Sequence, residues 1–148
     1  MLDRETMRAI GMMAARQARE RAASEGTPAN EIIDMTALLT PWKPGSMDMP
    51  AAYEAGCVYT YRGMPWRCVS AHVHHGEVGW EPGGGTALWA QKHGTDRAHA
   101  LPWAAPAGAH DAYNAGEWMM GSDGALYVCQ EDGTVWGPDV LPEAWAQG

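Results

Sequence analysis

The first apolar residues of this 148-residue chain recur at helical spacing. In "DRETMRAIGMMAARQARERAAS", residues 3–24, Met7, Ile10, Ala14 and Ala18 fall near one face of a helix, with Met13 beside them. Good helix formers fill the other positions, so the pattern predicts a helix over 3–24. Because the apolar stripe is thin and rich in alanine, the helix needs a partner, either copies of itself or its own domain.

A second, shorter helix is predicted directly after the first. "TPANEIIDMTALL" offers Thr27 as an N-cap and Pro28 as the first helical residue, and the pattern continues to about Leu39. "TPWKPGSMDMP" then ends the helical part with three prolines and a glycine. We therefore expect a helical segment over 1–39, used for oligomerisation or anchoring.

Beyond residue 40 the pattern changes to short alternating stretches, and it occurs twice. "VYTYRGMPWRCV" alternates around a glycine-containing turn, which predicts a β-hairpin. The repeated segments are Pro41-Trp42 with Pro102-Trp103, 51–56 with 111–116, 63–68 with 124–129, and 79–91 with 135–147. The predicted fold is mainly β with an N-terminal α-helical segment, followed by two small three-stranded antiparallel β modules in tandem, at 40–93 and 98–148.

Aromatic residues are unevenly chosen, with eight Trp, five Tyr and no Phe. A module of about 50 residues has little core, so large rings must supply the buried surface. Six tryptophans recur at equivalent places and are predicted to be core residues: Trp42, Trp80, Trp89, Trp103, Trp136 and Trp145. Trp66 aligns with Tyr127. Trp118 aligns with Val58, on the strand face opposite Met119, which makes it a candidate for an exposed ring.

Charge restricts the partners. The net charge is −8, and no Lys or Arg occurs from residue 98 to the end. That part of the chain carries seven acidic residues: Asp111, Glu117, Asp123, Glu131, Asp132, Asp139 and Glu143. Such a surface repels phosphate backbones, so nucleic acid is not expected as a partner. There is also no apolar run of membrane-spanning length and no apolar core of a signal peptide near the N-terminus.

Cysteine and histidine residues give little indication of catalytic or metal chemistry. Cys57, Cys68 and Cys129 lack C-x-x-C spacing, and the last two recur as small strand residues, which indicates burial. In "AHVHHGE", His72 and His74 share a strand face, with His75 beside them and Glu77 as a conceivable third metal ligand. A histidine that hydrogen-bonds the hairpin is the simpler interpretation, because the second repeat replaces this stretch. No metal, cofactor or enzymatic activity is predicted, since no phosphate loop or nucleophile elbow occurs.

The order of the anchors resembles a known family. Pro-Trp, then Tyr-x-x-Gly, a hairpin, Gly-x-x-Trp/Tyr-x-Cys, Trp-x-Pro and a closing Trp are similar to the small chitin-binding type of carbohydrate-binding module, families 5 and 12, as found in phage and prophage tail proteins. "TPWKPG" after a helical segment fits the phage version, and the resemblance covers 41–91 and 102–147. It implies a module that binds polysaccharide on exposed rings and performs no chemistry.

Two departures from that family concern the ligand. The Trp pair that serves those modules as a binding platform is replaced by "VSAH" at 69–72 and by "QEDG" at 130–133. The family's Asp after the Tyr-x-x-Gly glycine is Cys57 in the first repeat and Glu117 in the second. The resemblance therefore predicts the fold more directly than the sugar.

The resemblance implies a non-enzymatic phage virion protein, located at a tail tip, baseplate or fibre, that binds host-surface polysaccharide. Its implied partners are other virion proteins and further copies of itself through 1–39, and a trimer would suit a fibre. Candidate binding residues are Tyr61, Trp66, Trp80, Trp118, Tyr127 and Trp136. The main alternative is a structural or capsid-decoration protein whose modules dock other proteins; a third is a targeting module for a secreted polysaccharide hydrolase.

Overall fold

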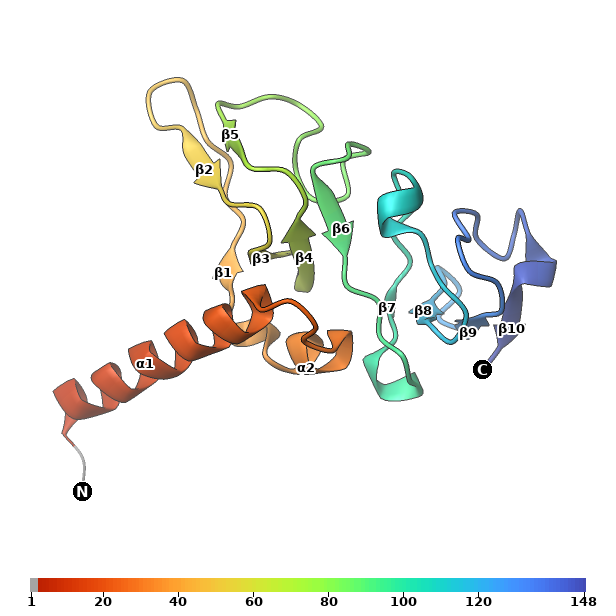
Figure 1. Ribbon diagram of the computed structural model, residues 1–148, viewed down its shortest axis with the longest axis horizontal. Coiled ribbons are helices and arrows are strands. Elements are labelled where there is room, and N and C mark those ends of the chain that lie inside the picture. Colours follow the sequence, from red (N-terminus) through yellow and green to blue (C-terminus); the bar gives the residue numbers. More distant parts are fainter. Residues whose placement is uncertain (1–2) are drawn as a thin grey trace.

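A helical segment and two β modules follow one another along the chain in the computed structural model, which describes residues 3–148 (Figure 1). The helices are α1 (Arg4–Ala23) and α2 (Ala29–Asp34). The strands are β1 (Thr40–Pro41), β2 (Ala51–Tyr53), β3 (Val58–Tyr61), β4 (Met64–Cys68), β5 (His72–His74), β6 (Trp89–Gln91), β7 (Leu101–Pro102), β8 (Trp118–Met120), β9 (Leu126–Cys129) and β10 (Trp145–Gln147). Single 3-10 turns occupy Thr36–Leu38, Arg97–His99, Ala109–Asp111 and Pro142–Ala144. The predicted class, mainly β with an N-terminal helical segment, is confirmed.

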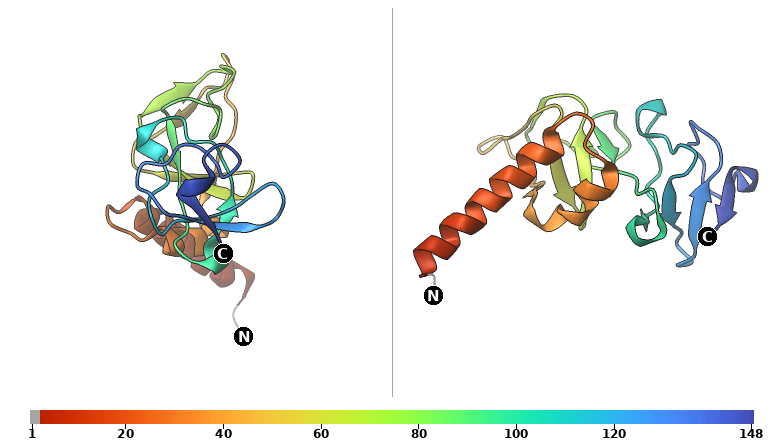
Figure 2. Two further views of the ribbon diagram at one scale, coloured as in Figure 1. Left: turned by 90° about the vertical axis from the view of Figure 1, so that its right-hand side faces the viewer. Right: turned by 60° about the horizontal axis from the view of Figure 1, so that its bottom comes forward.

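Helix α1 matches its predicted range and is anchored at one end only. The Asp3 carboxylate caps it by accepting a hydrogen bond from the Thr6 backbone N–H at 2.7 Å. Only Ala18 and Ala22, in the last two turns, are buried. The N-terminal half extends away from both sheets (Figure 2). Its apolar side chains are exposed: Met7 by 60%, Ile10 by 52% and Met13 by 54%.

Helix α2 is held against α1 and begins differently from the prediction. Pro28 occupies the N-cap position, and no side chain caps the helix. The Thr27 hydroxyl donates instead to the Arg21 carbonyl oxygen at 2.7 Å, so the predicted Thr27 cap is wrong. This bond satisfies a carbonyl near the end of α1 that has no partner within the helix. Arg21 and Glu31 add an ion pair at 2.9 Å between the two helices.

The helical segment closes over one face of the first module. Ala22, Ile32 and Leu39 form a buried cluster with Val58 of β3. Burial of these aliphatic groups holds the end of α1 and all of α2 on the sheet.

The first module is a sheet with the strand order β1-β3-β4-β6. Strands β3, β4 and β6 are antiparallel, with Tyr59 opposite Trp66 and Cys68 opposite Trp89. The hairpin turn is Arg62-Gly63, whose φ angles of 52° and 76° suit the tight two-residue turn that the alternation predicts. A separate ribbon, β2 with β5, completes the module.

The second module repeats this sheet in the order β7-β8-β9-β10. Tyr127 lies opposite Gln147, and Cys129 opposite Trp145. The three antiparallel strands expected in each module are present. A fourth strand, parallel and two residues long, is added by the Pro-Trp segments, β1 and β7. The separate ribbon is reduced to one bridge between Tyr113 and Thr134.

Both cores are aromatic, and their contacts are duplicated. The Trp89 indole N–H donates to the Trp80 carbonyl oxygen at 2.9 Å, and Trp145 donates to Trp136 at the same distance. Trp89 is 2% exposed and Trp145 7%. Cys68 and Cys129 are buried free thiols, as their recurrence predicts. Large rings therefore supply the burial in modules of this size.

Candidate functional site

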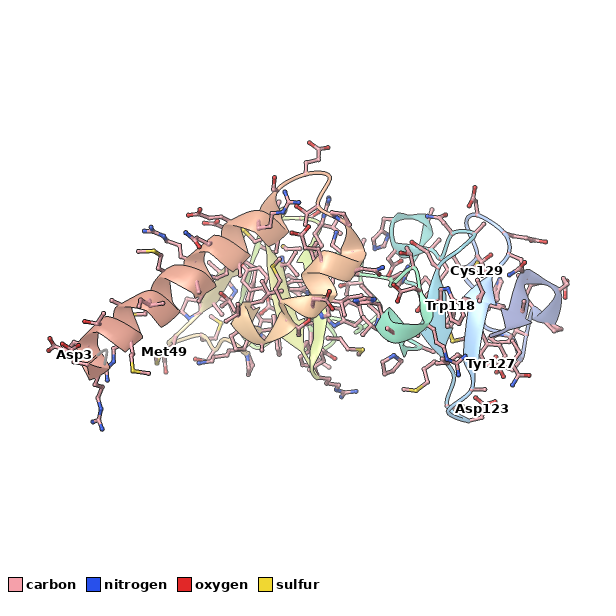
Figure 3. The ribbon with its side chains drawn as sticks, turned by 90° about the horizontal axis from the view of Figure 1, so that it is seen from below. Asp3, Met49, Trp118, Asp123, Tyr127 and Cys129 are labelled. Carbon is pink, nitrogen blue, oxygen red and sulfur yellow. The ribbon has the colours of Figure 1, made fainter. Side chains whose placement is uncertain are left out.

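A groove of about 640 Å³ opens on one side of the second module. Met119 and Trp145 lie at its base, and both are almost fully buried. One wall is the β8–β9 hairpin with Tyr127, and the other is the loop 137–139. Figure 3 shows Tyr127 and Asp123 at the hairpin, with the start of α1 at Asp3 at the far end of the molecule.

Carboxylate groups stand at the rim of the groove. The Tyr127 hydroxyl donates to Asp123 Oδ2 at 3.0 Å, and the Ala125 N–H donates to Asp123 Oδ1 at 3.0 Å. The Ala125 N–H lowers the pKa of Asp123, with the Tyr127 hydroxyl as the next cause. The hydrogen bond to Asp123 also raises the pKa of Tyr127, and the charge of Asp139 adds to this effect. The rim therefore presents an ionised Asp123 and a neutral Tyr127 phenol at neutral pH.

Two glycines keep the groove open. A Cβ on Gly121 would lie 2.8 Å from Asp123 Oδ1 and 3.1 Å from the Tyr127 ring. A Cβ on Gly137 would lie 3.0 Å from Asp139 Oδ1 and 3.6 Å from the Trp103 ring. Any larger residue at these positions would displace a carboxylate or fill the space between the rings.

The aromatic part of the groove is held rigidly. Trp103 is half-buried and stacks on Tyr113, with ring centroids 5.2 Å apart and 16° between the planes. It meets Trp145 edge-on at 6.0 Å. Since Tyr113 and Trp145 are buried, Trp103 is fixed from behind. A ring held in this way loses little conformational freedom when a ligand packs on it.

The equivalent groove of the first module is partly closed by the chain itself. Tyr61, Trp66 and the loop 81–83 form its walls, and the segment 103–105 lies in it, leaving about 230 Å³. Trp66 is only 3% exposed. In the first module, the segment 103–105 therefore takes up space that stays open in the equivalent groove of the second module.

The predicted binding residues do not come together in one site. Only Tyr127 lines the open groove, while Tyr61 and Trp66 lie in its closed counterpart. Trp80 is half-buried, with its ring 6.1 Å from that of His72. Trp118 is half-buried on the strand face opposite Met119, as predicted, but its ring packs against Gly148, where a Cβ would lie 2.3 Å from Cζ3.

Trp136 departs from its predicted place in the core. It is 58% exposed, although its counterpart Trp80 is half-buried. The first module places His72 of strand β5 beside Trp80, and the second module has a single bridge in place of that ribbon. Trp136 also lies outside the residues that line the groove.

Sequence reasoning missed Trp103, Asp123 and Asp139 as site residues. Trp103 recurs, which indicated a core role, and its role as both wall and support depends on tertiary contacts. Asp123 had a local signal, since the turn "GSDGA" places an acid next to the hairpin that carries Tyr127. Asp139 replaces Gly83 of the first repeat, and this exchange of glycine for a charged residue was a further signal.

The histidine stretch forms hydrogen bonds to backbone groups of its own segment and of the loop before β2. The Gly45 N–H donates to His74 Nδ1 at 2.9 Å, and His74 Nε2 donates to the Glu77 carbonyl oxygen at 2.8 Å. His72 Nδ1 donates to the Ser70 carbonyl oxygen at 2.7 Å. Within residues 3–148, no three His, Cys, Asp or Glu side chains come close enough to hold a metal ion.

Comparison with protein-family models and with curated proteins finds no match to this chain. Within the described part of the chain, no helix is both long and apolar enough to cross a membrane.

Proposed function

We propose that this chain is a non-enzymatic virion protein that binds host-surface polysaccharide for adhesion, and that the open groove of the second module is its binding site. The observation that carries the proposal is the combination of rigid aromatic walls with the carboxyl groups of Asp123 and Asp139 at the groove. The resemblance to carbohydrate-binding modules of phage tail proteins supports the virion setting.

The chemistry of the groove suits a sugar. Pyranose rings present flat C–H faces that pack on Tyr127 or Trp103, while their hydroxyls donate to Asp123 and Asp139. The surrounding module carries no Lys or Arg from residue 98 onward. Neutral or amine-bearing sugars are therefore favoured in the groove over acidic ones.

Attachment and oligomerisation are assigned to the helical segment. The exposed Met7, Ile10 and Met13 side chains on the protruding half of α1 offer an apolar stripe to further copies or to other virion proteins.

The test is binding of the intact protein to arrays of host cell-wall and lipopolysaccharide glycans. Tyr127→Ala should abolish binding, because it removes a stacking face and the partner of Asp123. Trp136→Ala is the matched control, since it removes an exposed ring outside the groove. Loss of binding in Trp136→Ala alone, or no binding by the unaltered protein, would contradict the proposal.

A second candidate function, protein docking, is favoured by one observation. The equivalent groove of the first module already holds a protein segment, 103–105. The matching segment at the start of the first module, 42–44, carries the exposed Lys43, whose charge complements Asp123 and Asp139. A second copy could then dock head to tail, by the contact that joins the two modules within one chain.

Charge exchange separates the two functions. If docking occurs, Lys43→Glu and Asp139→Lys should each lose the head-to-tail association in analytical ultracentrifugation, and a mixture of the two should regain it through the reversed pair. Glycan binding that depends on Tyr127, with no self-association through Lys43, would exclude docking and leave the adhesion function.

A further inference from the structure

Two positive side chains lie side by side where the modules meet. Arg67 is paired with Ala90 across strands β4 and β6, and the Lys92 N–H donates to the Pro65 carbonyl oxygen one step further along. Arg67 and Lys92 thus project from the same sheet face at diagonal positions, within reach of a common ligand. Both line a cavity of about 330 Å³ between the two modules.

Neither cation has a counter-ion. Within residues 3–148, the ion pairs formed by Lys or Arg side chains join Arg16 to Glu20 and Arg21 to Glu31, and no carboxylate lies within 4.0 Å of Arg67 or Lys92. Burial lowers the pKa of Lys92, and the positive charge of Arg67 lowers it further. A partly buried ammonium beside a guanidinium is unfavourable unless an anion completes the arrangement.

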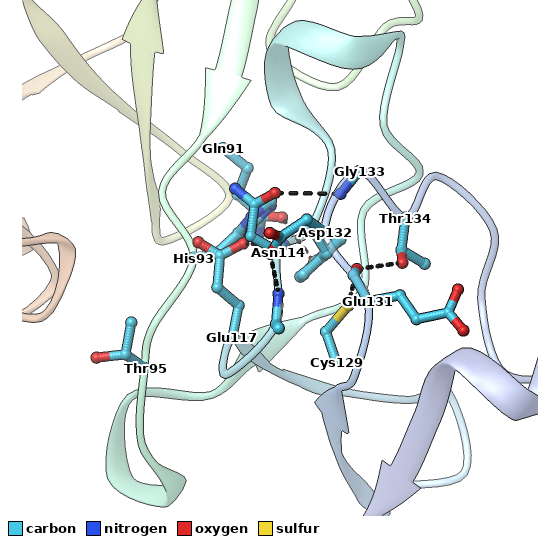
Figure 4. Close-up of polar contacts among 12 residues, drawn as sticks. Gln91, His93, Thr95, Asn114, Glu117, Cys129, Glu131, Asp132, Gly133 and Thr134 are labelled. Carbon is cyan, nitrogen blue, oxygen red and sulfur yellow. Dashed lines mark hydrogen bonds and ion pairs between the residues drawn. The ribbon is translucent and has the colours of Figure 1, made fainter.

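The carboxylates on the opposite wall are engaged elsewhere. Glu117 Oε1 accepts hydrogen bonds from His93 Nδ1 at 3.1 Å and from the Asn114 N–H at 2.7 Å. Asp111 accepts from two backbone N–H groups of its own loop, each at 3.1 Å, with His110 Nε2 at 3.7 Å. Figure 4 shows this side of the junction, with the His93 and Glu117 side chains next to each other. These acids are held by His93 and by backbone groups of the second module, and they do not pair with Arg67 or Lys92.

We propose that the cavity between the modules binds a small oxyanion, a phosphate, sulfate or carboxylate group, with Arg67 and Lys92 as its cationic ligands. A guanidinium holds two oxygens of such a group in a fixed fork, and an ammonium supplies a third contact without fixed direction. The oxyanion comes either from solution or from an acidic substituent on a polysaccharide.

The cavity is independent of the groove. The two share no lining residue. The cavity supplies two cations, whereas no Lys or Arg lines the groove, so this site extends recognition to a charge that the groove disfavours. Because residues of both modules line the cavity, a bound anion would also stabilise the junction.

The experiment is isothermal titration calorimetry of the full chain with inorganic phosphate, a hexose 6-phosphate and glucuronic acid at constant ionic strength. At least one probe should bind, and its affinity should fall roughly tenfold in Arg67→Gln and in Lys92→Gln, because each variant loses one charge-assisted contact. Binding of the free ion indicates a solution source, and binding of the sugar-borne groups alone indicates a polysaccharide substituent. Both results support the site.

A control keeps this result separate from the groove. Lys43→Gln removes an exposed cation outside both the cavity and the groove, and it should bind the probe as the unaltered protein does. Absence of binding for all three probes would overturn the proposal. So would equal binding by the Arg67→Gln/Lys92→Gln double variant, because that would be the general effect of anions on proteins.

Discussion

Gln91 and Gln147 occupy the same position at the end of the last strand of their modules, yet their surroundings are opposite. Gln91 is 6% exposed; its Nε2 donates to the Pro102 carbonyl oxygen at 3.3 Å, and its Oε1 accepts from the Tyr113 hydroxyl at 3.3 Å. Gln147 is exposed and lines the open groove. The first module thus uses this edge to hold the second, and the second module leaves the edge free.

Gln91→Ala should weaken the junction. It leaves the buried Tyr113 hydroxyl and the Pro102 carbonyl without this partner, which costs about 1–3 kcal/mol in the free energy of unfolding. Gln147→Ala is the matched control, and it should change the free energy of unfolding by less than about 0.5 kcal/mol. Urea unfolding of both variants measures the difference, and equal effects would contradict this account of the junction.

Replacement of Trp145 by Ala should cost about 3–5 kcal/mol, because it removes a buried ring together with its bond to the Trp136 carbonyl. Trp136→Ala removes only an exposed ring and keeps that carbonyl, so its cost should be small. Thermal unfolding of the two variants compares them, and a large loss in Trp136→Ala would show that this ring is covered in solution.

Thiol labelling should distinguish the three cysteines. Burial raises the pKa of Cys68 to about 11, and Cys129 is 1% exposed. Cys57 is half-buried, and burial and the nearby Glu54 raise its pKa as well, so its reaction should be slow but measurable. Iodoacetamide followed by mass spectrometry should find Cys57 labelled first in the folded protein and all three in urea. Equal rates for Cys57 and Cys68 in the folded protein would be inconsistent with the fold.

His99 should make the linker between the modules sensitive to pH. Its Nδ1 bonds Asp96 at 2.6 Å and its Nε2 bonds Asp34 of α2 at 2.7 Å, and these contacts, Asp96 first, raise the pKa of His99 above 6.5. The stabilisation is fully present below the ordinary pKa of histidine and is lost as pH rises through the raised value.

The measurement is the stability difference between the unaltered protein and His99→Gln across that interval. The difference should shrink as pH rises from about 6 to about 9. A His99 titration midpoint at or below 6.5 by NMR would contradict the sign.

Removal of residues 3–14 should leave both modules folded, because the buried Ala18 and Ala22 remain. The melting temperature should stay close to that of the full chain, and any oligomer should dissociate to monomers in analytical ultracentrifugation. An oligomer of unchanged mass would indicate that the modules, and not α1, form the self-association interface.

The features that could be predicted from the sequence are those marked by an internal repeat or by a periodic pattern of apolar residues. The helix at 3–24, the paired hairpins and the burial of Cys68 and Cys129 follow from local pattern and recurrence. The parallel strands β1 and β7 do not, because two residues leave no alternation to detect. Thr27 was misassigned because its hydroxyl had a competing acceptor at the end of α1, which only the tertiary fold supplies.

The candidate site was harder to predict than the fold. Recurrence marks a position, but it does not tell whether the neighbouring module covers that position. Trp66 and Tyr127 are equivalent in sequence, and only Tyr127 reaches an open groove. The asymmetry comes from the segment 103–105, whose place against the first module depends on how the two modules dock.

The closed groove of the first module limits valency. If every module that follows another covers its predecessor with its own leading segment, as 103–105 does here, a longer tandem array still offers a single vacant site, on its last unit. Lengthening the array would then add reach and no avidity. Under the proposed adhesion function, multivalent attachment would have to come from the number of chains assembled together, so tighter attachment would depend on the interface between chains and not on the count of repeats.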